Sequence, residues 1–216
     1  MKYDPNKHHR RSIRLKGYDY SRTGMYFITI CVKNRACLFG HIQCTGEPGV
    51  PSKIFLNDAG KMVETEWLKL PARFKNIQLH EYIVMPNHFH AILEIVGATL
   101  VVAQNETGIT HETGITHETG PSISGATTRV APTGPTNDGN GMVGKTVGDI
   151  VGAFQSIVTV EYIRGVKNNH WQPFDGKLWQ RNYWEHIIRN EKSFQIISEY
   201  ILNNPLKWRD DHFYIK

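Results

Sequence analysis

Two apolar runs joined by a short turn constrain the fold of this chain more than any other feature. IQLHEYIV (77–84) and HFHAILEI (88–95) each have the length and composition of a buried strand, and Met85-Pro86-Asn87 is a turn. The two runs predict neighbouring antiparallel strands. Because residues i and i+2 of a strand point to the same side of the sheet, His88 and His90 share a face. Such a pair is typical of metal ligands, and satisfied core histidines are the alternative.

The other periodic segments predict both strands and helices. Strands are expected at 25–32 and 178–188, and helices at 57–70, 146–165 and 191–204. Asn57 is placed to cap the first helix, which is expected to stop before Pro71. Thr146 and Asp149 suit a capping box for the second helix, and Pro205 is expected to end the third. This order predicts an α+β fold with a mainly antiparallel sheet and helices packed on it.

The segment 98–141 differs in composition from the rest of the chain. ETGITHETGITHETG repeats a six-residue unit, and Gly, Thr, Pro and Asn dominate the residues that follow it. Such a composition cannot bury enough apolar surface to offset the entropy lost on ordering. We therefore expect residues 1–97 and 142–216 to form a single domain, and 98–141 to be a low-complexity, flexible insertion.

Positive charge is concentrated near the N-terminus. Residues 1–35 contain nine lysines and arginines against two aspartates, whereas the whole chain has a formal net charge of +5. Tyr18 and Tyr20 lie among these basic residues. A basic segment with aromatic neighbours is typical of a polyanion contact, most often with nucleic acid. A solvated basic tail is the alternative.

Two further patterns suggest ligands that we do not expect. GNGMVGKT (139–146) satisfies the expression for a phosphate-binding P-loop, but PTGPTND precedes it in place of a strand, so no nucleotide cofactor is predicted. The cysteine count of three argues against a disulfide framework. The set Cys31, Cys37, His41 and Cys44 is a conceivable zinc site, but reduced core thiols are favoured over it.

Apolar segment length excludes a membrane protein. No apolar run in the chain reaches the roughly 18 to 20 residues needed to span a bilayer. The N-terminal segment is charged and lacks the apolar region of a secretory signal. The sequence therefore predicts a cytoplasmic protein without a membrane partner.

Four blocks of the chain resemble a known family. They are YIVMPN followed by HFH (82–90), WQRNYWEHIIRN (179–190), EYILNNP (199–205) and RRSIRLKGYDYSRTGMYFITICVKNR (10–35). Taken in their order along the chain, beginning with 10–35, they resemble the single-tyrosine HUH transposases, in particular the branch of REP-associated tyrosine transposases. The blocks cover nearly the whole chain outside 98–141. The resemblance implies an α+β fold of the HUH endonuclease kind, with a ferredoxin-like or RRM-like core.

The resemblance also implies the roles of four residues. The two histidines of the family bind a divalent metal, here Mg²⁺ or Mn²⁺ at His88 and His90. The family's nucleophilic tyrosine matches Tyr200, and a third metal ligand four positions later matches Asn204. Helical geometry agrees with this pairing, because residues i and i+4 of a helix lie on one face. An amide oxygen is a suitable hard ligand for these cations.

Two neighbours are the rivals for these roles. Asn203 could be mistaken for the third ligand, but it lies about 100° round the helix from Asn204 and is less well aimed. Tyr183 is the rival nucleophile, although the sequence does not place it on a helix beside a ligand candidate.

The function implied by the resemblance is that of a metal-dependent single-strand DNA endonuclease and strand transferase. It would act on hairpin DNA of the repetitive extragenic palindrome (REP) kind through a 5′-phosphotyrosine intermediate, as a monomer associated with the nucleoid. The alternatives are a non-catalytic nucleic-acid-binding protein that has kept the fold, and a metal-dependent nuclease without a covalent step.

Basic and aromatic side chains in the matching blocks are candidates for DNA contacts. The candidates are Arg10, Arg11, Arg14, Lys16, Trp179, Arg181, Tyr183 and Arg189. Trp184 could also stack on a base, and core filling is the alternative for both Trp179 and Trp184.

Replacing residues 100–140 by a short Gly/Ser linker should preserve folding, because the segment has no core-facing pattern. Soluble expression and thermal unfolding of the shortened chain test this expectation. Loss of soluble protein would show that the segment contains a structural element.

Overall fold

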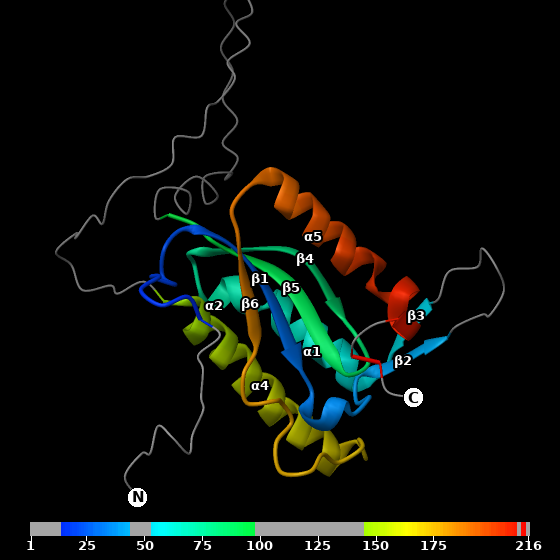
Figure 1. The fold of residues 1–216 in the computed structure, drawn as a ribbon. Coiled ribbons are helices and arrows are strands. Elements are labelled where there is room, and N and C mark those ends of the chain that lie inside the picture. Colours follow the sequence, from blue (N-terminus) through cyan, green and yellow to red (C-terminus); the bar gives the residue numbers. More distant parts are fainter. Residues whose placement is uncertain (1–13, 44–52, 98–144, 211–212, 215–216) are drawn as a thin grey trace, which may run out of the picture.

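A four-stranded antiparallel sheet is the centre of the fold. The computed structural model describes residues 14–43, 53–97, 145–210 and 213–214. The strands follow the order β4-β5-β1-β6 across the sheet, and every neighbouring pair is antiparallel. They are β1 (Gly24–Cys31), β4 (Ile77–Val84), β5 (His88–Ile95) and β6 (Trp184–Ile188). The predicted α+β class with a mainly antiparallel sheet is confirmed (Figure 1).

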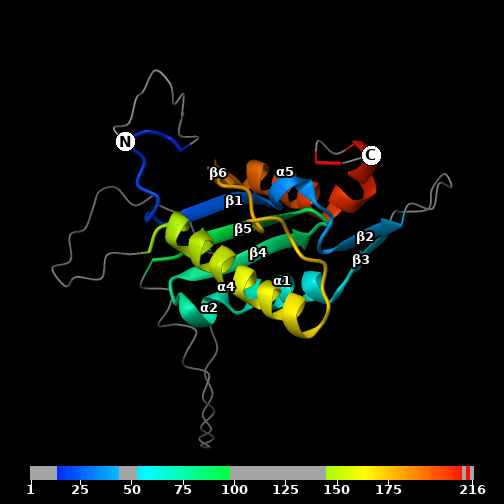
Figure 2. The same ribbon diagram turned by 90° about the horizontal axis from the view of Figure 1, so that it is seen from below.

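Helices cover both faces of this sheet. The helices α1 (Asp58–Leu68), α2 (Leu70–Arg73) and α4 (Val147–Asn168) lie on one face, and α5 (Glu191–Asn203) lies on the other (Figure 2). The larger apolar core lies between the sheet and the first layer, where Trp67, Phe89 and Phe154 pack with their rings in contact. A smaller cluster beneath α5 contains Ile92, Ile188 and Ile201. None of the helices in the described part of the chain has the length and apolar character needed to cross a bilayer.

The helix starts follow the predicted capping chemistry. The side chain of Asn57 accepts a hydrogen bond from the backbone N–H of Gly60 at the start of α1. Thr146 and Asp149 form the complete capping box at the start of α4. Asn190 caps α5 in the same way as Asn57 caps α1. These bonds satisfy amide groups that a helix cannot satisfy internally.

The first and third predicted helices end before their prolines, as expected. α1 ends at Leu68, and Pro71 lies in the first turn of the separate helix α2, where its missing N–H costs nothing. α5 ends at Asn203, and Pro205 lies in the 3₁₀ helix η2 (Asn204–Asp210) that follows it. Two other elements differ from the prediction. The strand expected at 178–188 is regular only in β6, because Trp179 turns into the core. The short pair β2 (Gly40–Gln43) and β3 (Lys53–Leu56) was not predicted.

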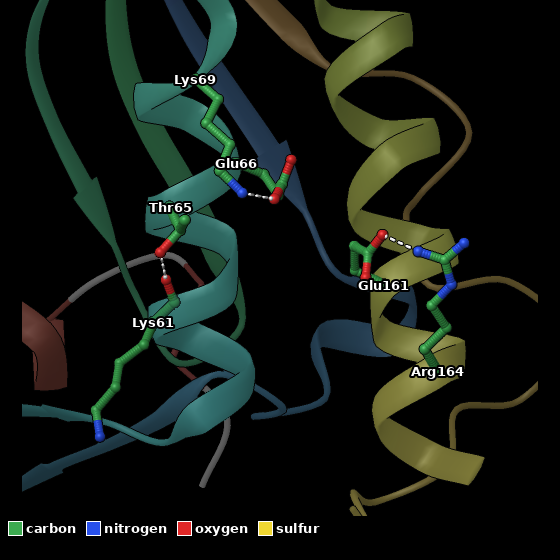
Figure 3. A network of polar contacts seen from close by, with 6 residues as sticks. All are labelled: Lys61, Thr65, Glu66, Lys69, Glu161 and Arg164. Atoms are coloured by element: carbon green, nitrogen blue, oxygen red, sulfur yellow. Dashed lines mark hydrogen bonds and ion pairs between the residues drawn. The ribbon is translucent and has the colours of Figure 1, made fainter. Parts of the chain in front are cut away.

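One ion pair lies at the end of α1 and another on α4. Lys69 Nζ, at the C-cap of α1, lies 2.7 Å from Glu66 Oε1, and Arg164 pairs with Glu161 on α4 (Figure 3). Both pairs join residues three apart, which are neighbours on a helix surface. Glu66 is buried, so Lys69 supplies a partner to a carboxylate that is largely withdrawn from water. The exposed pair of Arg164 contributes only about 0.2 to 1 kcal/mol.

Some predicted features lie outside the described residues. These are Arg10, Arg11, Cys44, the segment 98–141 and most of the P-loop-like sequence.

Two glycines of α4 should respond oppositely to substitution by alanine. A Cβ on Gly165 would lie 2.1 Å from the Trp171 ring, whereas a Cβ on Gly152 would meet nothing within 4 Å. Gly152→Ala should therefore raise the free energy of unfolding by about 1 kcal/mol through helix propensity. Gly165→Ala should lower it, because overpacking costs about 1 to 3 kcal/mol. Urea unfolding of both variants measures the two signs, and equal shifts would contradict the packing of Trp171 on α4.

Candidate active site

Two buried imidazoles lie side by side on the sheet face that α5 covers. His88 and His90 are 0% and 1% exposed, and their ring centroids are 4.5 Å apart. They occupy alternate positions of β5, as the strand period requires. Phe89 between them points to the opposite face and packs against Trp67. A strand in the middle of the sheet thus presents two polar rings in a largely apolar environment.

The orientation of His88 is fixed by the turn residue before it. The Nδ2 group of Asn87 donates to the backbone carbonyls of Arg35, at 3.1 Å, and Phe213, at 2.8 Å. The Oδ1 atom of Asn87 therefore faces His88 Nδ1, 2.8 Å away, and accepts a hydrogen bond from its N–H. This bond selects the tautomer of His88 whose lone pair is on Nε2.

A second polar contact holds His90. Thr29 stands opposite it in the β1–β5 register, and its hydroxyl oxygen lies 2.8 Å from His90 Nδ1. Both residues are buried, with Thr29 only 4% exposed. Burial lowers the pKa of His90 to about 3, so the imidazole is neutral at neutral pH. A neutral imidazole is the form that binds a cation.

Tyr200 of α5 lies directly above His90. Its hydroxyl oxygen is 3.4 Å from His90 Nε2, and its ring meets the rings of His90 and Phe27 edge-on. The Tyr200 side chain is 42% exposed, which opens it to a pocket of about 440 Å³. Tyr183 and Trp184 border the same pocket from the strand side. A phenol hydroxyl, a neutral imidazole and accessible space are therefore brought together.

Tyr183 has a different environment from Tyr200. Its hydroxyl accepts a hydrogen bond of 2.7 Å from Arg14 Nη2 and lies near the buried Glu185. Burial, reinforced by Glu185, raises the pKa of Tyr183 above that of an ordinary tyrosine. A phenol that holds its proton more tightly is a weaker source of phenolate. Tyr183 is therefore a poor source of phenolate in this environment.

The two asparagines at the end of α5 differ in burial. Asn204 is 3% exposed and Asn203 is exposed. Among the described residues, the buried Oδ1 of Asn204 has no hydrogen-bond partner. A buried polar atom left in this state costs about 1 to 3 kcal/mol, which a ligand to that oxygen would offset. The segment that follows stays close to the histidines, because the Trp208 ring stacks 6.1 Å from that of His88.

The side chains that could hold a metal ion are the imidazoles of His88 and His90 and the amide of Asn204. A hard cation prefers oxygen ligands, so this set suits one only if the Asn204 oxygen is included. In the described parts of the chain, no group of three or more His, Cys, Asp or Glu side chains is placed to hold a metal ion. This finding also gives no support to the zinc set, whose His41 stacks on Phe55. Two imidazole nitrogens and one amide oxygen remain as the available ligands, which suits Mg²⁺ or Mn²⁺ with further positions open.

The candidate DNA contacts are distributed over several surfaces. Lys16, Arg181 and Arg189 are exposed, and Arg14 is half-exposed with its Nε 3.5 Å from Glu185. Trp179 is 7% exposed and donates from its indole N–H to the carbonyl of Gln155, so it fills the core and its ring is not available for stacking on a base. Trp184, in contrast, is 55% exposed beside Tyr200.

Two residues of the site were missed by the sequence analysis. Thr29 is the only serine or threonine in the apolar run MYFITICV, and Asn87 immediately precedes the first histidine. Each is a polar residue in or next to a buried strand, where a polar side chain needs a hydrogen-bond partner, and this could have pointed to both. The register that makes Thr29 the partner of His90 could not be read from spacing alone.

Comparison with known proteins identifies one clear relative. An uncharacterized protein of Haemophilus influenzae is 38% identical over 214 residues, which cover 99% of this chain and 98% of that protein. No family model matches the sequence. A solved structure of a REP-associated tyrosine transposase bound to a REP hairpin is 16% identical, with a TM-score of 0.46 over 90% of this chain and 73% of that one.

Thr29→Val should remove the hydrogen bond to His90 while keeping the shape of the side chain at position 29. The substitution removes the partner of His90 Nδ1 and leaves a buried polar atom, at a cost of about 1 to 3 kcal/mol in the free energy of unfolding. Thr29→Ser keeps the hydroxyl and should restore the hydrogen bond. Nitrogen-15 NMR of the imidazoles, together with urea unfolding, measures both effects. An unchanged His90 tautomer in Thr29→Val would show that this contact does not orient the ring.

Proposed function

The chain belongs to the same family as the uncharacterized Haemophilus influenzae protein, and we propose that it is a metal-dependent single-strand DNA endonuclease and strand transferase. The observation that carries this proposal is the contact of 3.4 Å between the Tyr200 hydroxyl and Nε2 of the buried His90, at the edge of an open pocket. The sequence blocks that resemble the REP-associated tyrosine transposases include every residue of this contact.

His88, His90 and Asn204 would hold the divalent cation. Asn87 orients the first imidazole, Thr29 contacts the second, and the buried Oδ1 of Asn204 lacks a partner among the residues that the structure describes. A bound Mg²⁺ or Mn²⁺ supplies positive charge that polarises a phosphodiester and neutralises charge developing on its oxygens.

Tyr200 would act as the nucleophile. Its oxygen forms a bond to phosphorus while the bond from phosphorus to O3′ breaks, which leaves a 5′-phosphotyrosyl link and a free 3′-hydroxyl. The phenolic proton is lost to solvent or to a neighbouring base, and the O3′ oxygen takes up a proton as it leaves. One phosphodiester replaces another, so the step is reversible and rejoining needs no ATP. Reversibility suits strand transfer better than digestion.

The pocket around Tyr200 suits a single strand. The exposed Trp184 offers a ring face to a base. Arg14, whose Nη2 lies 2.7 Å from the hydroxyl of the pocket residue Tyr183, offers charge to a phosphate. The sequence resemblance narrows this substrate to hairpin DNA of the REP kind. Two alternatives use less of this site. A hydrolytic nuclease would need the cation site but no covalent step, and a DNA-binding protein without catalysis would need neither the cation nor the covalent step.

Tyr200→Phe should abolish both cleavage and the covalent protein–DNA adduct. The ring and its packing against Phe27 and His90 remain, so the fold and hairpin binding should persist. The measurement is gel analysis of labelled hairpin oligonucleotides with Mn²⁺ or Mg²⁺. Tyr183→Phe is the matched control and should still form an adduct. An adduct in Tyr200→Phe would move the nucleophile elsewhere, and wild-type cleavage without any adduct would favour the hydrolytic nuclease.

His88→Ala and His90→Ala should each abolish cleavage while the fold is retained. Asn204→Ala should raise the Mn²⁺ concentration at half-maximal binding by about tenfold or more, since the buried oxygen is lost. Asn203→Ala, at an exposed position, should change it little. Calorimetric titration of Mn²⁺ into the Tyr200→Phe background measures this without cleavage. Equal effects of the two asparagine variants would contradict the assigned third ligand.

A further inference from the structure

A groove separate from the Tyr200 pocket runs along α4. Two adjoining hollows of about 550 and 330 Å³ lie between this helix and the segment 174–183, and both are bordered by Gly152, Gln155 and Arg181. We call these two hollows the α4 groove. The trace of α4 in Figures 1 and 2 shows that it lies on the sheet face opposite α5, so the groove and the two histidines are on different faces.

The lining of the α4 groove is positively charged. Arg14, Lys177 and Arg181 border it, and no Asp or Glu is among the described residues that line it. Asp149 belongs to the capping box of α4, and Asp175 lies 3.4 Å from Lys33. Glu185 lies 3.5 Å from Arg14 Nε and balances that charge, so the positive charge of the lining comes from Lys177 and Arg181. Hydroxyl and amide groups of Gln155, Ser156, Thr159 and Asn182 complete the polar lining. Such a lining is complementary to a polyanion.

The α4 groove adjoins the Tyr200 pocket through one short segment. Gln180 borders both the larger hollow and the Tyr200 pocket, and Asn182 and Tyr183 border both the smaller hollow and that pocket. Residues 180–183 thus form a ridge with accessible space on either side. A chain that crosses this ridge passes from one sheet face to the other without entering the core.

From this arrangement we propose that the α4 groove binds the unpaired strand that flanks the hairpin, after it crosses the ridge from the Tyr200 pocket. This inference rests on the proposed function, because the phosphate that is cut at Tyr200 would fix where the strand begins. Hollows of a few hundred Å³ hold single nucleotides or small ligands, whereas a duplex needs a wider surface. A positively charged channel with aromatic neighbours is the usual arrangement for a single strand.

Gly152 offers a sharp test of this site. A Cβ there would meet nothing within 4 Å, so a side chain can be added toward the groove without displacing its neighbours. Gly152→Glu would place a carboxylate beside Arg181, fill part of the groove and repel phosphates. Gly152→Lys would add a cation of similar length, and Gly152→Ala tests the loss of glycine alone.

The experiment measures DNA affinity in the Tyr200→Phe background, where cleavage does not interfere. The probes are two synthetic oligonucleotides with the same hairpin, one with and one without an unpaired flank of eight nucleotides on each side. Relative to Gly152→Ala, Gly152→Glu should weaken binding of the flanked hairpin about tenfold or more, with no matching loss for the blunt hairpin. Thermal unfolding confirms that each variant is folded.

Charge is tested at the same site by salt dependence. Lys177→Ala and Arg181→Ala should each reduce the slope of log affinity against log salt by about 0.7 for the flanked probe, since each phosphate contact on a single strand releases counterions. Arg164→Ala is the control, because this exposed cation on α4 pairs with Glu161 and does not border the groove (Figure 3). For Arg164→Ala, the slope of log affinity against log salt should equal that of the Tyr200→Phe protein.

Two results would overturn the α4 groove as a binding site. One is flanked-hairpin affinity in Gly152→Glu equal to that of Gly152→Ala, and the other is equal loss for the flanked and blunt probes. Failure of the proposed covalent step would be seen differently. The wild-type protein would form no adduct, while Gly152→Glu and Gly152→Ala would still differ in affinity for the flanked hairpin.

Discussion

The antiparallel pairing of β1 and β5 is the constraint on which the candidate site depends. Its register places Thr29 opposite His90 and Cys31 opposite His88, so all four side chains face α5. Because side chains alternate along a strand, a shift of one residue would turn both histidines toward α1 and α4 and bring Phe89 to the other face. The register is therefore held by the same apolar core that Phe89, Trp67 and Phe154 form. The packing that forms the large core therefore also fixes which way the two imidazoles point.

Burying two imidazoles has an energetic cost that their neighbours offset only in part. Each ring has one nitrogen in a hydrogen bond of 2.8 Å, to Asn87 or to Thr29, and desolvation keeps His90 uncharged. The Oδ1 of Asn204 lies buried and has no hydrogen-bond partner within the described ranges. A core optimised for stability alone would replace such groups by hydrocarbon. Their position beside an accessible tyrosine is typical of a functional site, where stability is given up locally.

The parts of the fold with long, regular patterns could be predicted from the sequence. The strands at 77–84 and 88–95, their antiparallel pairing, and the caps at Asn57 and Thr146 depend on local chemistry, and the structure has each of them. The pair β2 and β3 was not predicted, because four residues are too few to show a period. Thr29 was not recognised as a site residue, because its role arises from a partner 61 positions away in the chain. Local patterns thus predict elements, while cross-strand register determines the site.

The segment 178–183 has accessible space on both sides because it is not a regular strand. Trp179 anchors it in the core by its indole bond to the Gln155 carbonyl, and the backbone N–H of Gln180 donates to the Cys31 carbonyl at the end of β1. The residues between this anchor and β6 are therefore held at the sheet edge without forming a regular strand. A complete strand there would pair along β1 and close the passage between the faces. The irregular stretch instead leaves accessible space on either side of Asn182 and Tyr183. The same core tryptophan that shortens the predicted strand thus creates the ridge over which a single strand would pass.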